Sequence, residues 1–176
     1  IRKMLIPFEK KNIEEDWIRQ ANGYIRHMQG EYRDRTVYIA NLSEAIYYPP
    51  DPQDVPRLMK KWVREANIEA TTVKELFEKI AASHVRFERI HPFSDGNGRT
   101  GRMIVNQQLI NSGFLPVSIP PTGKYREAFR RYDKNEDLSE MVYVLLKSEL
   151  DSFDRVRNLA QKFARDREKQ KSETIS

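Results

Sequence analysis

The segment HPFSDGNGRTGR, which ends at Arg102, carries the side chains whose types and spacing are most specific for chemistry. Gly96 and Gly98 flank Asn97, and these residue types tolerate turn conformations that aim successive backbone N–H groups inward as an anion-binding nest. A helix predicted to begin near Arg99 adds its positive N-terminal end. Arg99 and Arg102 are three residues apart, so they share one face of the first helical turn and can both contact phosphate oxygens. The segment therefore predicts a phosphate-binding site.

Two further side chains of this segment could supply a metal ligand and a base. The carboxylate of Asp95 would repel phosphate unless a cation lies between them, and Mg²⁺ commonly binds through one or two carboxylates together with substrate phosphates. His91 titrates near neutrality and can accept a proton from an attacking hydroxyl. Each residue taken alone also fits a polar connector between two helices. Their combination instead matches the groups that phosphoryl or nucleotidyl transfer requires.

The rest of the chain is dominated by apolar residues at helical spacing, which predicts an all-α fold. Pro92 disfavours α-helical geometry at the residue before it, so the preceding helix should stop and project His91 from its end. We expect the helices to cover residues 14–29, 54–66, 72–90, 99–112, 124–132 and 138–150. The phosphate-binding segment thus joins two of the most regular helical patterns.

One stretch, residues 36–48, departs from the helical pattern. It is rich in β-branched and aromatic residues at both ends with turn-forming residues between them, and Pro49 and Pro50 follow it, so it predicts a short β-hairpin. A lone hairpin is marginally stable, and we expect it to pack on the helices or to hold something. The predicted domain is residues 1–150, containing the hairpin at about 36–50 and the loop at 91–102. The highly charged residues 151–176 predict an exposed helix or tail.

Composition excludes several classes of protein. The 176 residues contain no cysteine, which rules out disulfides, thiolate catalysis and cysteine-bound zinc, and fits a reducing, cytoplasmic compartment. No apolar run approaches the roughly 18 residues of a membrane helix. The net charge of +5 is spread along the helices, so a nucleic-acid partner is not favoured. Because the first residue is Ile1, we expect the sequence to be a piece of a longer protein.

The segment at residues 91–102 resembles the signature of the Fic family, H-x-F-x-(D/E)-G-N-(G/K)-R-x-x-R, at every fixed position. Other stretches also resemble the family, namely the entry to its hairpin flap (30–33 and 37–39), the segment after the flap (49–55) and the part bordering the nucleotide base (125–129 and 132–133). Together the resemblance covers roughly residues 17–150.

The resemblance implies a mainly helical fold with one β-hairpin flap, and transfer of AMP from ATP to a Ser, Thr or Tyr hydroxyl of a target protein. It implies that His91 is the general base and that Asp95 holds Mg²⁺. The nucleotide-binding residues would be Gly96, Asn97, Gly98, Arg99, Thr100, Gly101, Arg102, Tyr125 and Asp133. The flap residues that dock the protein substrate by strand addition would be Ile39, Ala40, Asn41, Ile46 and Tyr47.

Two departures from family patterns bear on activity and control. Gly98 stands where the kinase-like Doc branch carries Lys, which favours AMP transfer over phosphotransfer. The inhibitory motif (S/T)-x-x-x-E-(G/N) is not found, because Thr71 and Glu75 have its spacing but Leu76 follows them. We therefore expect an inhibitory helix to lie upstream or in a separate protein. The alternative functions are removal of AMP, transfer of another phosphate compound, and partner binding by a non-catalytic Fic scaffold.

Overall fold

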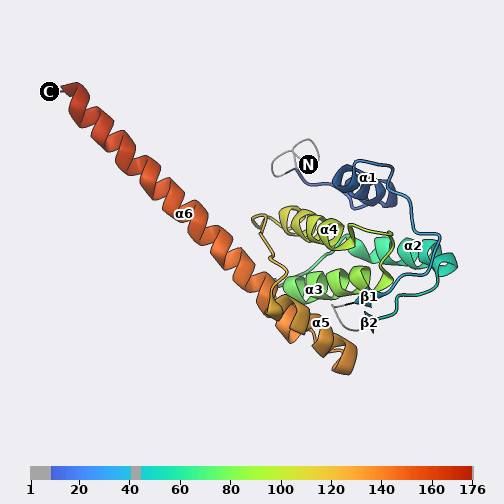
Figure 1. The fold of residues 1–176 in the computed structure, drawn as a ribbon. Coiled ribbons are helices and arrows are strands. Elements are labelled where there is room, and N and C mark those ends of the chain that lie inside the picture. The colour runs from blue at the N-terminus through green and yellow to red at the C-terminus, as the bar shows by residue number, and fades with distance from the viewer. Residues whose placement is uncertain (1–8, 41–44, 176) are drawn as a thin grey trace.

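The computed structural model describes residues 9–40 and 45–175, and it is mainly helical (Figure 1). The elements are α1 (Glu15–Arg26), β1 (Ile39–Ala40), β2 (Ala45–Tyr47), a 3₁₀ turn (Pro52–Asp54), α2 (Val55–Ala66), α3 (Val73–Ile90), α4 (Asn97–Asn111), α5 (Gly123–Asn135) and α6 (Ser139–Ile175). The prediction of a helical fold with one short hairpin is confirmed. No helix within the described ranges is long and apolar enough to cross a membrane.

Helix α3 is the central element, and it packs against α2, α4 and α6. One side of the core gathers Phe77, Ile80 and Val85 with apolar residues of α4, α5 and α6. The other side places Phe87 against Trp62 of α2, whose indole N–H donates to the Ser83 carbonyl at 2.9 Å. Burial of each such large side chain contributes roughly 1.5–3 kcal/mol. The C-terminal end of α3, from which His91 follows, is therefore firmly held.

Helix α1 ends earlier than the sequence pattern predicts. It stops at Arg26, because His27 adopts a left-handed conformation (φ 57°) and its N–H bonds the Gly23 carbonyl. The prediction of a helix up to residue 29 is therefore wrong. Gly30 is required, since a Cβ at this position would lie 1.7 Å from the carbonyl oxygen of Arg19. The chain folds back on α1 through this close contact.

The hairpin is shorter than the predicted 36–48. Ile39 pairs with Tyr47 and Ala40 with Ala45 in an antiparallel arrangement with one register irregularity. Asn41 lies outside the described residues, and Ile46 is placed only by its backbone in β2. The ring of Tyr47 lies on the guanidinium of Arg89, 4.3 Å from its carbon to the ring centre, which is a cation–π contact. The hairpin therefore rests on α3, as expected of an element that is unstable alone.

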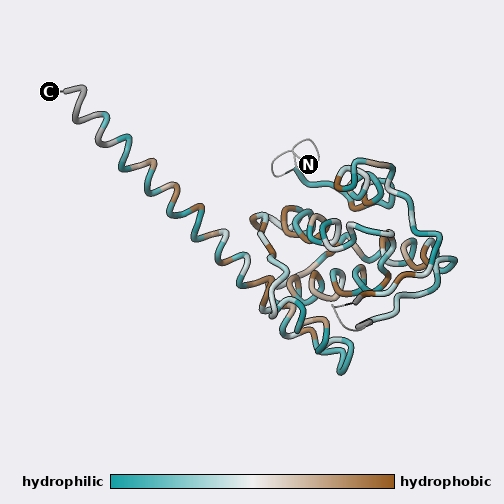
Figure 2. The backbone as a smooth tube through the Cα atoms, in the orientation of Figure 1, coloured by the Kyte–Doolittle hydropathy of each residue, from teal (hydrophilic) through white to brown (hydrophobic). Residues whose placement is uncertain are grey.

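Helix α6 continues unbroken to Ile175 and projects far from the helical body (Figure 1). No glycine or proline interrupts residues 139–175, so nothing in the chain stops the helix at Leu150, where the apolar pattern fades. Beyond Ser152 the side chains of residues 153–167 are all exposed. Figure 2 shows hydrophilic and hydrophobic residues mixed along this projecting part.

Candidate functional site

The loop between α3 and α4 positions the predicted base. His91 caps α3 in a left-handed conformation (φ 49°, ψ 60°), with its N–H bonded to the Phe87 carbonyl at 3.0 Å. A positive φ is uncommon for a residue other than glycine. Pro92 does exclude the α-helical region at His91, as the sequence indicates, but the result is a left-handed turn. This turn directs the chain from the end of α3 into the loop.

The loop is braced by side chains that point into it. Asn97 is buried, and its amide both accepts from the Phe93 N–H (2.9 Å) and donates to the Phe93 carbonyl (2.7 Å). Thr100 is also buried and donates its hydroxyl hydrogen to the Gly96 carbonyl at 3.0 Å. From α1, Asn22 donates to the Asp95 carbonyl at 3.0 Å. The side chains of Asn97 and Thr100 therefore shape the loop, which leaves backbone N–H groups to meet a ligand.

Helix α4 presents its N-terminal end at this loop. It begins at Asn97 with Gly96 as N-cap (φ 82°), two residues before the predicted start at Arg99. The first N–H groups of a helix have no acceptor within it, so those of Asn97, Gly98 and Arg99 belong to the open end. Together with the helix dipole they give this end the chemistry that an anion needs. Gly101 does not face this end, because a Cβ at this position would point toward Glu88 and His84 of α3.

The charges around the loop include one that the sequence did not indicate. The Asp95 carboxylate pairs with Arg26 of α1 and lies 3.8 Å from Arg99, while its other oxygen accepts from the Gly96 N–H at 2.6 Å. Its side chain is 55% exposed. The sequence did not indicate the ion pair between Arg26 and Asp95, because the two residues lie far apart in the chain. The carboxylate therefore has a protein cation beside it.

Arg99 and Arg102 border a groove of about 700 Å³ beside α4. Its walls are otherwise largely apolar and include Ile25 of α1, Met103 of α4 and Ile119 before α5. The two arginines of the first turns of α4 thus supply positive charge to this groove.

The geometry of His91 suits a base. Its Nδ1 lies 3.2 Å from the Glu88 carbonyl oxygen, which can only accept, so Nδ1 carries the proton and Nε2 is the basic nitrogen. Burial lowers the pKa of His91, partly offset by this hydrogen bond, and the nearby charges of Arg33 and Arg89 lower it further. The lowered pKa favours the neutral imidazole, which is the form that accepts a proton.

Three buried polar groups lie behind the loop. Glu88 of α3 is buried, one of its oxygens has no hydrogen-bond partner, and burial raises its pKa to about 7 against the lowering effect of Arg102. His84 contacts the Tyr125 hydroxyl at 2.8 Å, and burial lowers the pKa of His84 to about 3. Tyr125, predicted to contact the nucleotide, is itself buried, with the Arg102 guanidinium 6.0 Å from its ring centre.

Asp133 is occupied by an ion pair. Both of its oxygens accept from Arg89, one of them at 2.7 Å. The Arg89 guanidinium carbon also lies 4.3 Å from the ring centre of Tyr47 and 4.8 Å from that of Phe129. The structure thus links Asp133 to the hairpin through Arg89, an arrangement that no spacing in the sequence indicates.

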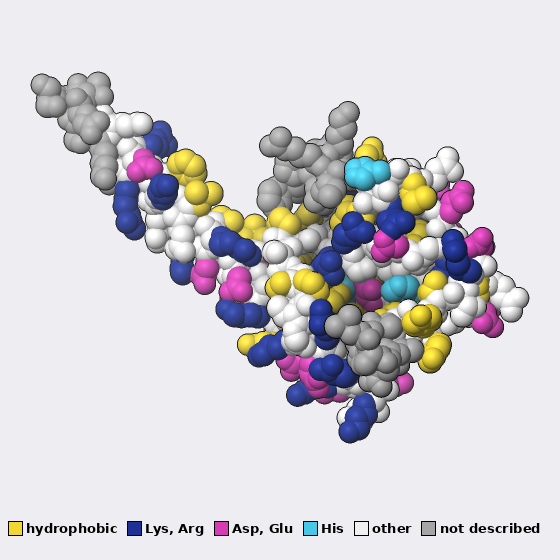
Figure 3. Space-filling model, in the orientation of Figure 1, with side chains coloured by type: hydrophobic (Ala, Val, Ile, Leu, Met, Phe, Trp, Pro, Cys, Tyr) yellow, Lys and Arg dark blue, Asp and Glu magenta, His cyan; other side chains and the backbone are white. Residues whose placement is uncertain are grey.

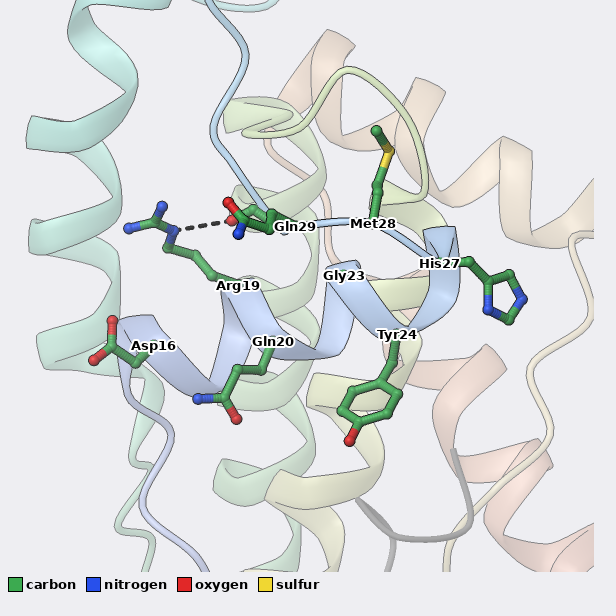
Figure 4. Close-up of a pocket in the computed structure, with 9 residues that line it drawn as sticks. Asp16, Arg19, Gln20, Gly23, Tyr24, His27, Met28 and Gln29 are labelled. Carbon is green, nitrogen blue, oxygen red and sulfur yellow. Dashed lines mark hydrogen bonds between the residues drawn. The ribbon is translucent and has the colours of Figure 1, made fainter.

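A second hollow, of about 680 Å³, lies along the outer side of α1 (Figure 4). It is lined by Asp16, Arg19, Gln20, Tyr24 and His27, among others, and Arg19 is engaged with the Gly30 carbonyl at 2.9 Å. None of the loop residues 91–102 lines it. On the molecular face shown in Figure 3, lysines and arginines are interspersed with acidic side chains, which does not resemble a continuous nucleic-acid surface.

Comparison with known proteins gives consistent matches. The model of the Fic/DOC family matches residues 12–109. A protein of Drosophila melanogaster named protein adenylyltransferase Fic is 35% identical over 103 residues, which are 58% of this chain and 20% of that protein. The structure of Fic-1 from C. elegans has 26% identity and a TM-score of 0.69, covering 86% of this chain and 45% of that one. A Fic domain containing signaling protein from Bacteroides thetaiotaomicron has 26% identity and a TM-score of 0.66, covering 79% and 59%.

Proposed function

The chain belongs to the Fic/DOC family, and on that premise we propose that it transfers AMP from ATP to a Ser, Thr or Tyr hydroxyl of a target protein. The observation that carries the proposal is the His91 ring, held by the Glu88 carbonyl at the start of the loop that leads into the N-terminal end of α4. Relatives with the name protein adenylyltransferase support the same reaction, although the match spans only about a fifth of their length.

In the proposed reaction the target hydroxyl oxygen forms a bond to the α-phosphorus of ATP. The bond from that phosphorus to the bridging oxygen breaks, and pyrophosphate leaves with its electron pair. Nε2 of His91 accepts the hydroxyl proton, because Nδ1 is already protonated and bonded to Glu88. The backbone N–H groups of Asn97, Gly98 and Arg99, at the open end of α4, stabilise the charge on the α-phosphate oxygens, while Gly96 shapes the turn because its own N–H bonds Asp95. Arg99 and Arg102, which border the adjacent groove, bind the outer phosphates.

Asp95 is the proposed ligand of Mg²⁺. Its carboxylate is more than half exposed and lies at the open end of α4, where the phosphates would enter. No group of three potential metal-binding side chains occurs in the described part of the chain, which fits an ion held by one carboxylate and the nucleotide. Mg²⁺ bound there would neutralise phosphate charge. The Asp95 carboxylate would then be shared between Mg²⁺ and Arg26.

The flap is the proposed docking site for the target. A segment of the target would add as a strand beside residues such as Ile39 and Tyr47, the pair that closes the hairpin at its base. The proposal also includes three residues that lie between Ile39 and Tyr47 in the chain, namely Ala40, Asn41 and Ile46. Two further residues are proposed to border the adenosine, each through the arginine that it contacts. Tyr125 would act through Arg102, and Asp133 would act through Arg89.

The groove beside Arg99 and Arg102 is the proposed site for an inhibitory helix from upstream or from a separate protein. Its apolar walls at Ile25, Met103 and Ile119 suit one face of a helix, and its arginines suit a carboxylate. Such a helix would compete with the outer phosphates for the same cations.

Intact mass spectrometry of candidate target proteins tests the proposal. After incubation with this chain, ATP and Mg²⁺, we expect a target to gain the mass of one AMP group. No gain on any candidate or on the chain itself would favour a non-catalytic scaffold. Loss of AMP from a target modified beforehand, in reactions without ATP, would favour the reverse activity.

A further inference from the structure

Arg33 is a buried arginine that connects three separate parts of the chain. Its side chain donates from Nε to the His91 carbonyl at 2.8 Å, from Nη1 to the Arg35 carbonyl at 3.1 Å, and from Nη2 to the Pro50 carbonyl. Its own backbone N–H donates to the Pro92 carbonyl at 2.9 Å. The residue is 3% exposed. One guanidinium therefore contacts both ends of the flap and the backbone of the proposed base.

These contacts fix geometry because a guanidinium is planar and its N–H groups have set directions. Arg35 lies four residues before β1 and Pro50 three residues after β2, so the two acceptors flank the hairpin in the chain. The third acceptor belongs to a residue in a left-handed conformation, whose carbonyl direction determines how the chain continues into the loop. Burying a cation is costly unless its hydrogen bonds are made, so the three carbonyls must be present together.

We propose that Arg33 is a positioning residue that couples the flap to His91. By holding both ends of the hairpin and the His91 carbonyl on one rigid group, it fixes the distance between a docked target strand and the imidazole. The inference rests on the proposed function, since the flap is taken to dock the target. A simple packing role predicts a different result, in which loss of Arg33 weakens the whole helical body.

Hydrogen exchange of Arg33→Gln and Arg33→Lys tests the coupling without any need for activity. Neither side chain can supply three coplanar donors, and the lysine keeps the charge if the glutamine variant fails to fold. We expect faster exchange at 36–40, 45–48 and 91–95 together, with the interior of α3 unchanged. Arg57→Gln, which removes an exposed arginine of α2, is the matched control and should change none of these. Faster exchange in only one of the three regions, or equally in all helices, would overturn the proposal.

Kinetics of AMP transfer give the second readout. In Arg33→Lys we expect kcat to fall by about tenfold or more, because the target hydroxyl and the base are misaligned, with the KM for ATP unchanged. A rise in the KM for ATP with kcat unchanged would contradict the coupling. If the unmodified chain transfers no AMP at all, the proposed function fails, and the exchange experiment still decides whether Arg33 couples the flap to His91.

Discussion

His91 illustrates how this chain could prepare an ordinary residue type for the proposed role of base. The left-handed backbone places the ring beside the end of α3, and the Glu88 carbonyl fixes its tautomer. Burial and two arginines then keep it neutral. The position of His91 at the end of α3 could be predicted from the sequence, because Pro92 follows it. The contact with Arg33 could not, because it joins positions 58 residues apart.

The lowered pKa of His91 predicts the pH dependence of the reaction. A base must be unprotonated, so activity should be lost as the pH falls through its pKa and should be constant above it. Because the pKa is lowered, the midpoint should lie below the ordinary histidine value of about 6.5. A profile of kcat/KM against pH measures this midpoint, and a titration of His91 by NMR measures the pKa of the imidazole. A midpoint above that value would contradict the environment described for His91.

Arg102 is expected to contribute to nucleotide affinity. Hydrogen bonds between charged partners contribute roughly 1.5–3 kcal/mol, so Arg102→Ala should weaken ATP binding by about tenfold or more. Titration with a fluorescent ATP analogue measures this directly, and Arg57→Ala on the surface of α2 serves as control. Unchanged affinity in Arg102→Ala would remove this residue from the proposed phosphate site.

At the scale of helices, the sequence predicted where α2 to α5 lie to within a few residues. Helical spacing and the Thr72 cap, whose hydroxyl accepts from the Glu75 N–H at 3.2 Å, account for this success. The end of α1 was missed because His27, which is not a typical helix stop, adopts a positive φ. The close contact between α3 and α4 was also missed, because nothing in the residue spacing shows that Glu88 of α3 packs against Gly101 of α4.

Close packing of α3 on α4 predicts that Gly101 does not tolerate a side chain. The Cβ of Gly101→Ala would lie 2.4 Å from a Glu88 carboxylate oxygen and 3.0 Å from the His84 ring. We expect a loss of about 1–3 kcal/mol of stability from overpacking, measured by chemical denaturation. Gly123→Ala is the matched control, because nothing lies within 4 Å of its Cβ position. Equal stability of both variants would show that the Glu88 and His84 side chains can move aside without cost.

On the scale of the whole molecule, the helical body and the projecting part of α6 have different roles in stability. Leu145 is fully buried in the core, and the Ser152 hydroxyl donates to the Pro116 carbonyl at 3.1 Å. The exposed side chains that follow include Phe153, Leu159 and Phe163. The sequence indicated the change of character after residue 150 but not the length of the helix.

Removal of residues 156–176 should therefore leave the body intact. We expect a melting temperature within about 2 °C of the full chain, since the side chains of residues 156–167 are all exposed. Differential scanning calorimetry and ATP titration measure the two properties. A shorter chain that also lacks Leu145 is the control and should unfold. A large loss of stability on removing only 156–176 would mean that the projecting helix supports the body.

The central claim is that a phosphate loop with His91 as its base transfers the AMP part of ATP. Parallel reactions with ATP labelled at the α-phosphate and at the γ-phosphate, each with the unmodified chain and with His91→Ala, test it most directly. We predict that label from the α-phosphate becomes attached to protein, that label from the γ-phosphate does not, and that His91→Ala abolishes attachment. Attachment of the γ-label, or of the α-label in His91→Ala, would contradict the claim.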